Sequence, residues 1–405
     1  MNPIPLGNIK VVELSTYVAA PSCARMLADM GAKVVKIEAF RGDPWRYTSM
    51  ATTYTDENEI PMFDIYNAGK ESICLDIKNP VGMKILMEML ETADVFVTNT
   101  RPASLKKQGL DYDSLKEKFP RLIYATVTGY GEKGPEADKP GFDNVAFWTR
   151  SGFLRDMAID APGSYPVASP TGAGDSNTGA LLFGGVVTAL YQREFTGKGD
   201  YITVALYNAG IWMLGSMICS SNPKYGISYP KKRSECSPFA TIYRCADDEW
   251  VSVTILDYLR YRDIAFNLLG VAEEFGKQNI DVSTLANLKK NSDRVIPILE
   301  AAFLKKTAAE WDKLFNEADL VCSRLTHMTD VHHNEQARVN GFVQDYTFRN
   351  GETAVLPCPP IRMASQPPAR SDYAPLAGEN TDKVLADMGY SAEKIAELKA
   401  MGAVK

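Results

Sequence analysis

The chain has 405 residues, which is long for a single hydrophobic core, so two or three domains are expected. Hydrophobic residues make up 45% and charged residues 23%, a composition typical of ordinary globular proteins. The net charge of −6 argues against a nucleic-acid-binding protein, whose surface is usually basic. It does not exclude a small anionic ligand, because local charge placement decides that binding.

The seven cysteines are scattered and form no C-x-x-C pair, which is typical of reduced thiols rather than of a disulfide framework or a zinc site. The N-terminal segment "MNPIPLGNIKVVELS" has no basic region followed by an apolar stretch, so no signal peptide is expected. The most apolar runs, residues 179–191 and 209–219, are too short to span a bilayer and predict buried helices. We therefore expect a cytoplasmic protein that binds neither membrane nor nucleic acid.

Along residues 1–131, short β-branched runs alternate with helical patterns. Strands are predicted at residues 9–15, 33–38, 93–99 and 121–131, and helices at residues 22–30 and from Asn79 onward. Near-continuous apolar strands that alternate with helices are typical of a parallel sheet covered on both faces. The predicted fold class is therefore α/β, with a Rossmann-like parallel-sheet large domain.

Beyond this region the pattern changes. A long helix is predicted from Asp175 to about Gly197, followed by a strand at residues 201–206 and a second apolar helix. A polar linker at 220–238 leads to a hairpin of residues 239–245 and 250–256, and helical segments continue to about residue 319. The proline-rich residues 356–378 should run extended over a surface, and a last amphipathic helix begins near Thr381. We divide the chain into a large domain at 1–220, a smaller α+β domain at 221–325 and a C-terminal segment at 326–405 that returns to the large domain.

Several common cofactor and catalytic motifs are absent. The turn after the first strand, "STYVAAPSCA", lacks the G-x-G-x-x-G of dinucleotide-binding folds, and the sequence contains no G-x-x-x-x-G-K-[ST] and no G-x-S-x-G. Use of NAD or ATP and serine-hydrolase chemistry are therefore disfavoured. The three histidines, His327, His332 and His333, cluster near Glu335, but their spacing matches no metal-ligand motif. We expect no metal site and no bound cofactor.

A single acid, Asp175, stands at the start of an otherwise apolar helix, directly after Gly172-Ala173-Gly174. One interpretation is a helix N-cap, because aspartate oxygens accept hydrogen bonds from the free backbone N–H groups there. The other interpretation is that a ligand must approach Asp175 closely and that the glycines make room for it.

Basic side chains follow several of the predicted strands. In an open α/β sheet, ligands bind beyond the carboxyl ends of the strands. A single lysine there is more often simply solvated, but several at one edge indicate a phosphate-rich ligand. The residues concerned are Lys78, Arg101, Lys106, Lys107, Lys133 and Lys139.

Six segments together resemble family III CoA-transferases: "IKVVELSTYVAAPSCARMLADMGAKVVKIEAFRGDPWR", "KESICLDIKNPVG", "TGYGEKGP", "GAGDSNTGA", "TGKGDYITVAL" and "PLAGENTDKVLADMGY". The resemblance covers nearly the whole chain, and the middle motifs are specific in combination. Within the family, the chain is most similar to the 2-hydroxyacyl transferases of amino-acid-fermenting anaerobes, which act on (R)-2-hydroxyisocaproate or phenyllactate.

This resemblance implies a set of site residues. Asp175 matches the catalytic nucleophile, Asp143 matches an acid that supports the anhydride steps, and Phe142 beside it belongs to the acceptor pocket. Residues at or beside positions that hold CoA are Val18, Ala19, Leu75, Lys78, Asn99, Thr100, Arg101, Lys107 and Lys139. The resemblance also implies a homodimer in which two chains interlock as linked rings, with residues 356–378 as part of the wrap.

The reaction implied is transfer of CoA from an acyl-CoA, such as the 2-enoyl thioester isocaprenoyl-CoA, to a 2-hydroxy acid such as (R)-2-hydroxyisocaproate, in the fermentation of leucine. The Asp175 carboxylate attacks the acyl-CoA to give a mixed anhydride, and the thiolate returns to form an aspartyl-CoA thioester. The acceptor acid then takes over the CoA through a second anhydride. We expect the helix N-terminus to favour the ionised nucleophile, and the backbone N–H groups of residues 172–175 to stabilise the oxyanions.

Three positions depart from the family pattern. Ala39 stands where an arginine often follows the glutamate that ends the second strand, and Val18 replaces a glutamine. The glycine-rich flap of oxalate-using members is missing, and "KKRSECSPFATIY" stands near its place. An apolar acceptor pocket for a branched-chain or aryl acid is predicted from Val18 and from the run of Phe142, Val145, Phe147 and Trp148.

Two other functions stay open: an acyl-CoA racemase of the same fold, and a non-catalytic acyl-CoA-binding protein. Racemisation needs an acid and a base on opposite faces of the α-carbon. Similar racemases supply one of them from a Gly-His-Asp triplet, where this chain has Gly141-Phe142-Asp143. Because a phenylalanine carries no proton, the transferase is favoured.

Overall fold

The computed structural model describes residues 4–47, 56–365 and 373–405 of the chain. The chain forms two compact units, each built from more than one stretch of sequence. The first comprises Met1–Phe153, Ala168–Cys219 and Asn334–Lys405, and the second comprises Leu154–Val167 and Ser220–His333. The predicted small domain at 221–325 falls within the second unit, which also takes in residues 154–167 and continues to residue 333.

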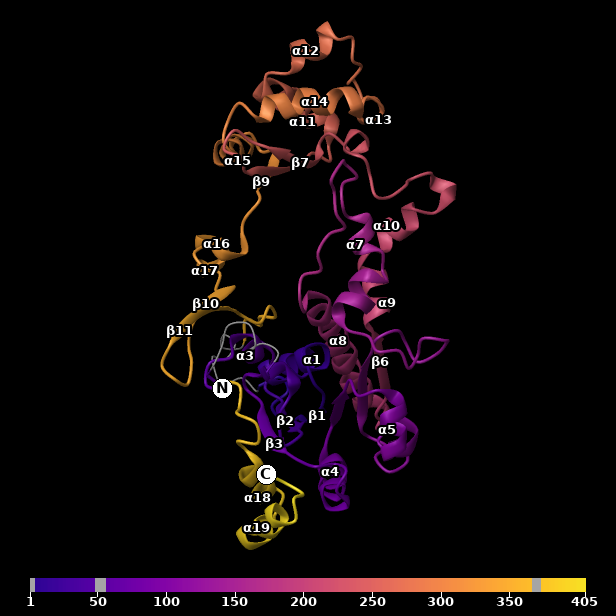
Figure 1. Cartoon of the computed structure of the whole chain (residues 1–405), viewed down its shortest axis with the longest axis vertical. Helices are drawn as coiled ribbons and strands as arrows, with labels where there is room; N and C mark the ends of the chain where they lie inside the picture. Colours follow the sequence, from indigo (N-terminus) through magenta and orange to yellow (C-terminus); the bar gives the residue numbers. More distant parts are fainter. Residues whose placement is uncertain (1–3, 48–55, 366–372) are drawn as a thin grey trace. The chain divides into compact units, whose positions relative to one another are not determined.

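A six-stranded parallel sheet lies at the centre of the first unit (Figure 1). Its strands are rich in β-branched residues, which fit the pleated and buried surface of a sheet. The order across the sheet is β3-β2-β1-β4-β5-β6, so the direction of chain progression reverses between β1 and β4. The bounds are β1 (Lys10–Leu14), β2 (Lys33–Glu38), β3 (Glu71–Cys74), β4 (Val95–Thr98), β5 (Ile123–Thr128) and β6 (Tyr201–Ala205).

The parallel sheet and the alternating helices confirm the predicted α/β fold class. Strands were predicted at the positions of β1, β2, β4, β5 and β6, and each of them is found. The sequence pattern missed β3 because this strand has only four residues, ESIC, too few to show a period.

Helices cover both faces of the sheet. On one face, α1 (Ala19–Asp29) and α8 (Ala173–Thr196) contact each other and the strands. They approach closely because Gly179 has no side chain: a Cβ there would lie 2.5 Å from the carbonyl oxygen of Ala19. On the other face, a hydrophobic cluster includes side chains of α4 (Pro80–Thr92), α5 (Pro102–Gln108), α18 (Thr381–Asp387) and α19 (Ala392–Ala400).

The remaining short helices connect these elements. They are α3 (Pro61–Asn67), α6 (Tyr112–Leu115), α7 (Phe153–Asp156), α9 (Leu206–Met213), α10 (Gly215–Ser220), α16 (Met328–Val331) and α17 (Glu335–Val339), with a π-helix at Asp143–Thr149 and 3-10 turns at Pro223–Tyr225 and Arg233–Glu235. No helix in the described part of the chain combines the length and the apolar character that a membrane span requires.

The C-terminal residues return to the edge strand β3. The Asn380 side chain accepts a hydrogen bond from the backbone N–H of Ser72 at 2.8 Å, and Leu75 pairs with Val404 in an antiparallel bridge. Figure 1 shows the yellow helices α18 and α19 next to this edge. The helix predicted near Thr381 is therefore confirmed as α18. Before α18, β10 (Val343–Thr347) and β11 (Thr353–Pro357) form an antiparallel hairpin. The first residues of the predicted extended segment 356–378 therefore belong to a strand. Residues 366–372 of that segment lie outside the described residues.

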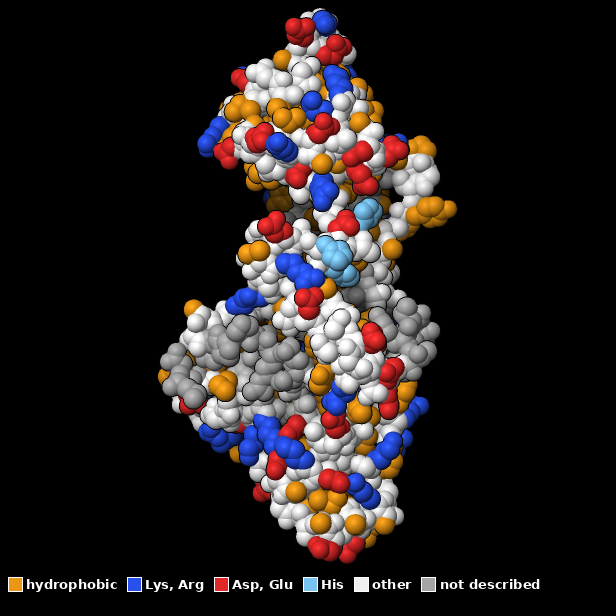
Figure 2. Space-filling model, turned by 90° about the vertical axis from the view of Figure 1, so that its left-hand side faces the viewer, with side chains coloured by type: hydrophobic (Ala, Val, Ile, Leu, Met, Phe, Trp, Pro, Cys, Tyr) orange, Lys and Arg blue, Asp and Glu red, His pale blue; other side chains and the backbone are white. Residues whose placement is uncertain are grey.

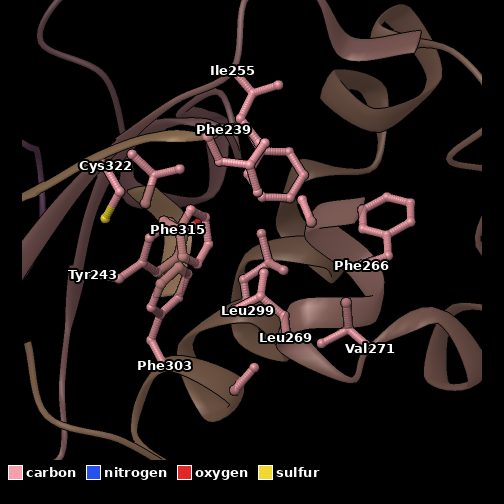
Figure 3. Close-up of a cluster of buried hydrophobic side chains, with 14 of the residues drawn as sticks. Phe239, Tyr243, Ile255, Phe266, Leu269, Val271, Leu299, Phe303, Phe315 and Cys322 are labelled. Carbon is pink, nitrogen blue, oxygen red and sulfur yellow. The ribbon is translucent and has the colours of Figure 1, made fainter. Parts of the chain in front are cut away.

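The second unit packs helices against a three-stranded antiparallel sheet. The sheet consists of β7 (Ala240–Arg244), β8 (Trp250–Thr254) and β9 (Val321–Arg324), which confirms the predicted hairpin and adds one strand to it. The helices are α11 (Tyr258–Leu269), α12 (Ala272–Lys277), α13 (Leu285–Lys290), α14 (Ser292–Phe303) and α15 (Ala308–Glu317). Figure 3 shows the core between them, in which the rings of Tyr243 and Phe303 stack at 4.5 Å. This unit therefore has a hydrophobic core of its own.

A cluster of buried charges joins β1 and β2 to the loops beside them. We call it the Glu13 cluster and define it by Glu13, Lys36, Asp43 and Lys70. Lys36 Nζ lies 2.9 Å from Glu13 Oε1 and 3.0 Å from Asp43 Oδ2, and Lys70 Nζ lies 2.8 Å from Glu13 Oε2. All four side chains are fully buried. Burial alone would raise the pKa of Glu13, but the two lysines outweigh it and lower that pKa to about 2.

We expect Glu13→Gln to destabilise the protein by about 3–5 kcal/mol, because it leaves two buried lysines without their shared counter-charge. Folding lowers the pKa of Glu13 from 4.5 to about 2, so its stabilisation is fully present above pH 4.5 and is lost as the pH falls toward 2. Chemical denaturation of both proteins at neutral and at acid pH measures the difference. Asp113→Asn, which breaks the exposed pair with Lys116, is the matched control and should leave stability unchanged. A Glu13→Gln deficit that is as large at pH ~2.5 as at neutral pH would contradict this account.

Candidate active site

The carboxyl ends of the parallel strands border a groove made of two neighbouring pockets. The first, the Asp175 pocket, measures about 360 Å³ and is lined by the loops after β1, β4 and β5 and by Asp175 of α8. The second, the edge pocket, measures about 500 Å³ and is lined by the loops after β1, β2 and β3. Both include Thr16 and Thr100, where the strand order reverses. One groove therefore runs from the end of β3 to Asp175.

Most residues predicted to hold CoA line this groove. The Asp175 pocket includes Ala19, Asn99, Thr100, Arg101 and Lys139, and the edge pocket includes Leu75, Lys78 and Thr100. Two predicted residues lie elsewhere. Val18 is buried, with its Cγ1 atom 3.8 Å from the position that a Cβ on Gly172 would take. Lys107 lies in the last turn of α5, outside both pockets.

The helix that carries Asp175 is capped by a different acid. Asp175 is the third residue of α8, after Gly172 at the N-cap in left-handed conformation, φ 74°. Asp143 Oδ2 accepts hydrogen bonds from the backbone N–H of Gly172 at 3.0 Å and from the indole N–H of Trp148 at 3.1 Å, and Asp143 Oδ1 accepts one from the N–H of Asp175 at 2.9 Å. The N-cap interpretation of Asp175 is therefore wrong, because Asp143 satisfies these donors. The Asp175 carboxylate accepts no hydrogen bond from any residue that the structure describes.

The glycine before Asp175 serves this cap rather than an incoming ligand. A Cβ on Gly174 would lie 2.3 Å from Asp143 Oδ1 and 2.5 Å from the ring of Phe147. The missing side chain thus lets Asp143 and Phe147 pack onto the first turn of α8. The expectation that the glycines make room for a substrate is corrected accordingly for Gly174. The expected oxyanion role of the N–H groups of Gly172 and Asp175 is also wrong in this geometry, since both already donate to Asp143.

The position of Asp175 raises its affinity for a proton. Burial, and after it the negative charge of Asp143, raise the pKa of Asp175 from 3.8 to about 7. Burial also raises the pKa of Asp143 itself. We expected the helix N-terminus to keep the Asp175 carboxylate ionised. With its pKa raised to about 7, the carboxyl group is instead partly protonated near neutral pH.

The predicted acceptor pocket is only partly formed by the residues named for it. Phe142 lines the Asp175 pocket and is 54% exposed. Phe147 and Trp148 are buried in the core, and neither they nor Val145 line the pocket. The segment "KKRSECSPFATIY", proposed to stand near a missing flap, lies in the second unit.

Sequence reasoning missed Tyr17, a further aromatic residue of the Asp175 pocket. Its ring lies edge-on to Phe142, with centroids 5.2 Å apart, and 6.3 Å from Trp45. Tyr17 also has a positive φ of 64°. Its place in the turn after the first strand, where ligands bind in such sheets, was the available signal.

The described residues contain no group of three or more His, Cys, Asp or Glu side chains that could hold a metal ion. The three histidines, His327, His332 and His333, are exposed, and Figure 2 shows histidine side chains on the surface. His327 Nε2 lies 3.9 Å from a Glu249 oxygen.

We expect Asp175→Asn to stabilise the protein progressively more as the pH rises. Folding raises the pKa of Asp175 from 3.8 to about 7, so the folded protein binds this proton more tightly than the unfolded chain does. The stability of the wild-type protein relative to the asparagine variant therefore decreases as the pH rises from 3.8 to about 7, and it is constant above this range. Thermal melting of both proteins across this range measures the effect, with Asp113→Asn as the exposed control. A difference that does not change with pH would show that Asp175 titrates normally.

Comparison with known proteins gives consistent results. The model of CoA-transferase family III matches residues 6–381. The (R)-2-hydroxy-4-methylpentanoate CoA-transferase of Clostridioides difficile is 36% identical over 401 residues, covering 97% of this chain and 98% of that protein. The cinnamoyl-CoA:phenyllactate CoA-transferase of Clostridium sporogenes is 37% identical over 397 residues, covering 97% and 95%. The crystal structure of a mutant of Rv3272 from Mycobacterium tuberculosis superimposes with a TM-score of 0.81 at 25% identity, covering 94% of this chain and 98% of that chain.

The family model covers most of the chain, and both transferases exceed 30% identity over nearly its whole length. The fold and the groove agree with this assignment. The chain therefore belongs to CoA-transferase family III and is a CoA-transferase.

Proposed function

We propose that this enzyme transfers CoA from an acyl-CoA, a 2-enoyl-CoA such as isocaprenoyl-CoA, to a 2-hydroxy acid such as (R)-2-hydroxyisocaproate, through a thioester on Asp175. The observation that carries the proposal is the Asp175 carboxylate, which lies in a pocket with no hydrogen bond to the described residues while Asp143 caps its helix. The names of the two similar transferases support the substrate class. This reaction fits a place in the fermentation of leucine.

The groove suits the two parts of a CoA thioester. Exposed cations stand along it, with Lys78 at the edge pocket and Arg101 and Lys139 at the Asp175 pocket. Positive side chains on a groove attract the phosphates of CoA and raise its local concentration. Phosphates bound by these cations leave the thioester end of CoA directed toward Asp175. Lys139 also pairs with Glu136 at 2.9 Å beside the groove.

Four exchange steps complete the transfer without any cofactor. An Asp175 carboxylate oxygen adds to the thioester carbonyl carbon, the C–S bond breaks, and an anhydride and the CoA thiolate result. The thiolate attacks the aspartyl carbonyl, which releases the donor acid and leaves CoA on Asp175. The acceptor carboxylate attacks this thioester and expels the thiolate, which then attacks the acceptor carbonyl. The new acyl-CoA leaves, and the Asp175 carboxylate is restored.

Asp143 supports these steps by position and by charge. Its side chain holds the first turn of α8, and its negative charge raises the pKa of Asp175, which makes the ionised carboxylate more basic. The racemase alternative lacks support at the neighbouring position, because Phe142 lines the pocket and carries no proton.

A homodimer, interlocked as in the family it resembles, is part of this proposal. The outer face of α8 carries apolar side chains that the described chain leaves exposed, among them Tyr191 at 69% and Phe195 at 73%. Trp212 of α9 is 78% exposed. The rings of Tyr191 and Phe195 contact each other, with centroids 5.0 Å apart, and exposed apolar side chains that adjoin in this way favour an interface. The seven cysteines are all free thiols, which supports a cytoplasmic location.

The central prediction concerns the covalent intermediate. Incubation with an acyl-CoA should give a CoA adduct that mass spectrometry assigns to the peptide carrying Asp175. Asp175→Ala should lose both the adduct and CoA transfer to (R)-2-hydroxyisocaproate while remaining folded, since the helix cap comes from Asp143.

Asp138 lines the same pocket and is the comparison carboxylate. Loss of the adduct in Asp138→Ala but not in Asp175→Ala would overturn the assignment. Incorporation of deuterium at the α-carbon of the acyl-CoA in D₂O, without an acceptor acid, would favour the racemase.

Neutralising two of the cations along the groove should weaken the binding of acyl-CoA but not of the acceptor acid. Lys78→Ala combined with Arg101→Ala is expected to raise KM for acyl-CoA by about tenfold or more, because both charges face the phosphates. KM for the acceptor acid should stay nearly constant, and the dependence of the rate on salt should flatten because screening acts on the lost contacts. Lys116→Ala, at a remote exposed pair, is the control. Equal increases in both KM values would contradict the proposal that Lys78 and Arg101 bind the phosphates of CoA.

The dimer prediction uses the outer face of α8. Light scattering should give twice the chain mass for the wild-type protein, and Tyr191→Glu with Phe195→Glu should reduce it by burying charges in an apolar contact. Gln192→Glu adds a charge at an exposed position on the same helix and should leave the dimer intact. A monomeric wild-type protein would refute the proposal.

A further inference from the structure

Tyr17 has an unusual backbone conformation. Four described residues other than glycine have a positive φ, and three of them, Asp248, Asn279 and Asp319, are of types that tolerate it through short polar side chains. Tyr17, at φ 64°, is the bulky member of this group. Such strain persists where the surrounding structure enforces it, and it concentrates at functional sites.

The Glu13 cluster is part of what enforces this conformation. The backbone N–H of Tyr17 donates to Asp43 Oδ1 at 3.1 Å, and Asp43 Oδ2 pairs with the buried Lys36 at 3.0 Å. On the other side, the ring of Tyr17 is fixed by its edge-on contact with Phe142 and by Trp45. Backbone and ring are thus held independently, and Tyr17 lines the Asp175 pocket.

The first turn of α8 offers few free donors to a substrate. The N–H groups of Gly172 and Asp175 donate to Asp143, and the N–H of Gly174 is directed to the same carboxylate. The N–H of Ala173 donates to the carbonyl of Pro170, and that of Ser176 to the carbonyl of Gly172. A negatively charged oxygen formed next to Asp175 therefore needs a donor from another part of the pocket than this turn.

Among the pocket's side chains, the phenol of Tyr17 fits this requirement. Asn99 is committed, because its oxygen accepts from the Thr16 N–H at 3.0 Å and its nitrogen donates to the Thr16 carbonyl at 2.7 Å. The Tyr17 hydroxyl makes no hydrogen bond to any described residue. The next residue, Val18, packs against Gly172 at the N-terminus of α8. This segment therefore adjoins the helix end that carries the nucleophile.

We propose that Tyr17 is a catalytic residue whose phenol donates a hydrogen bond to the oxyanion formed when Asp175 adds to the thioester carbonyl. The inference rests on the proposed function of Asp175. In this step the Asp175 oxygen bonds to the carbonyl carbon, and the C=O π pair moves onto oxygen. That pair re-forms the carbonyl as the C–S bond breaks and the thiolate leaves. The phenol keeps its proton throughout, and the same donor serves the other additions at Asp175.

Tyr17→Phe keeps the ring and its aromatic contacts and removes the hydroxyl alone. We expect kcat to fall by about 10²-fold or more, as for loss of one oxyanion donor. KM for acyl-CoA and the melting temperature should stay nearly unchanged. Rapid-mixing measurement of the first CoA release should slow by the same factor as kcat. Incorporation of 3-fluorotyrosine at position 17, which retains a hydroxyl donor, should restore the rate.

Tyr66→Phe is the matched control, because the Tyr66 hydroxyl bonds to Ser176 Oγ at 3.1 Å and lies outside the Asp175 pocket. Its kcat should stay within about threefold of wild type. An active wild-type enzyme with an Asp175 adduct, in which Tyr17→Phe keeps its kcat or changes only KM, would overturn the inference. A larger loss in Tyr66→Phe than in Tyr17→Phe would overturn it as well. Absence of transfer and adduct in the wild-type enzyme would instead refute the proposed function.

Discussion

The ion pairs around Lys36 are the constraint on which the rest of the site depends. A buried lysine is tolerated only when its charge is compensated, and Lys36 is held by Glu13 from the neighbouring strand and by Asp43 from the loop after its own strand. Asp43 in turn fixes the backbone of Tyr17. The loops after β1 and β2 are therefore held together beneath the groove. The conformation of the pocket wall at Tyr17 depends on these fully buried charges.

The site also separates two tasks that a single acid could have combined. A carboxylate that caps its own helix accepts hydrogen bonds from the backbone N–H groups there, and these bonds lower its pKa and make it a weaker base. Here Asp143, at the start of the π-helix Asp143–Thr149, caps the helix instead, and Asp175 stays without those bonds. Its raised pKa follows from burial and from the cap's negative charge. Keeping this group desolvated costs stability, and in the mechanism proposed above it makes the ionised carboxylate a stronger nucleophile.

The sequence predicted what depends on local patterns and missed what depends on distant contacts. Strands such as β1 and β5 were predictable because runs of β-branched residues need no partner to be recognised, whereas β3 was too short. The role of Gly174 was misjudged because its neighbour Asp143 lies 32 positions before Asp175 in the sequence, and nothing local indicates that they meet. Residues 154–167 likewise belong to the second unit through distant contacts, among them a bridge between Asp160 and Lys232. Family resemblance supplied most of the groove residues, since those positions depend on the fold rather than on one contact.

The pairing of β3 with the C-terminal residues has a consequence for how the protein is made. Ser72 bonds to Asn380, 308 positions later, so the edge strand is synthesised long before the residues that cover it. An uncovered edge offers unpaired N–H and C=O groups to other chains. During translation this edge is therefore exposed while the second unit is still emerging from the ribosome. Because Leu75 and Lys78 follow the same strand, the edge pocket takes its final form only at the end of synthesis. In the mechanism proposed above, the nascent chain therefore carries Asp175 long before its CoA groove is complete.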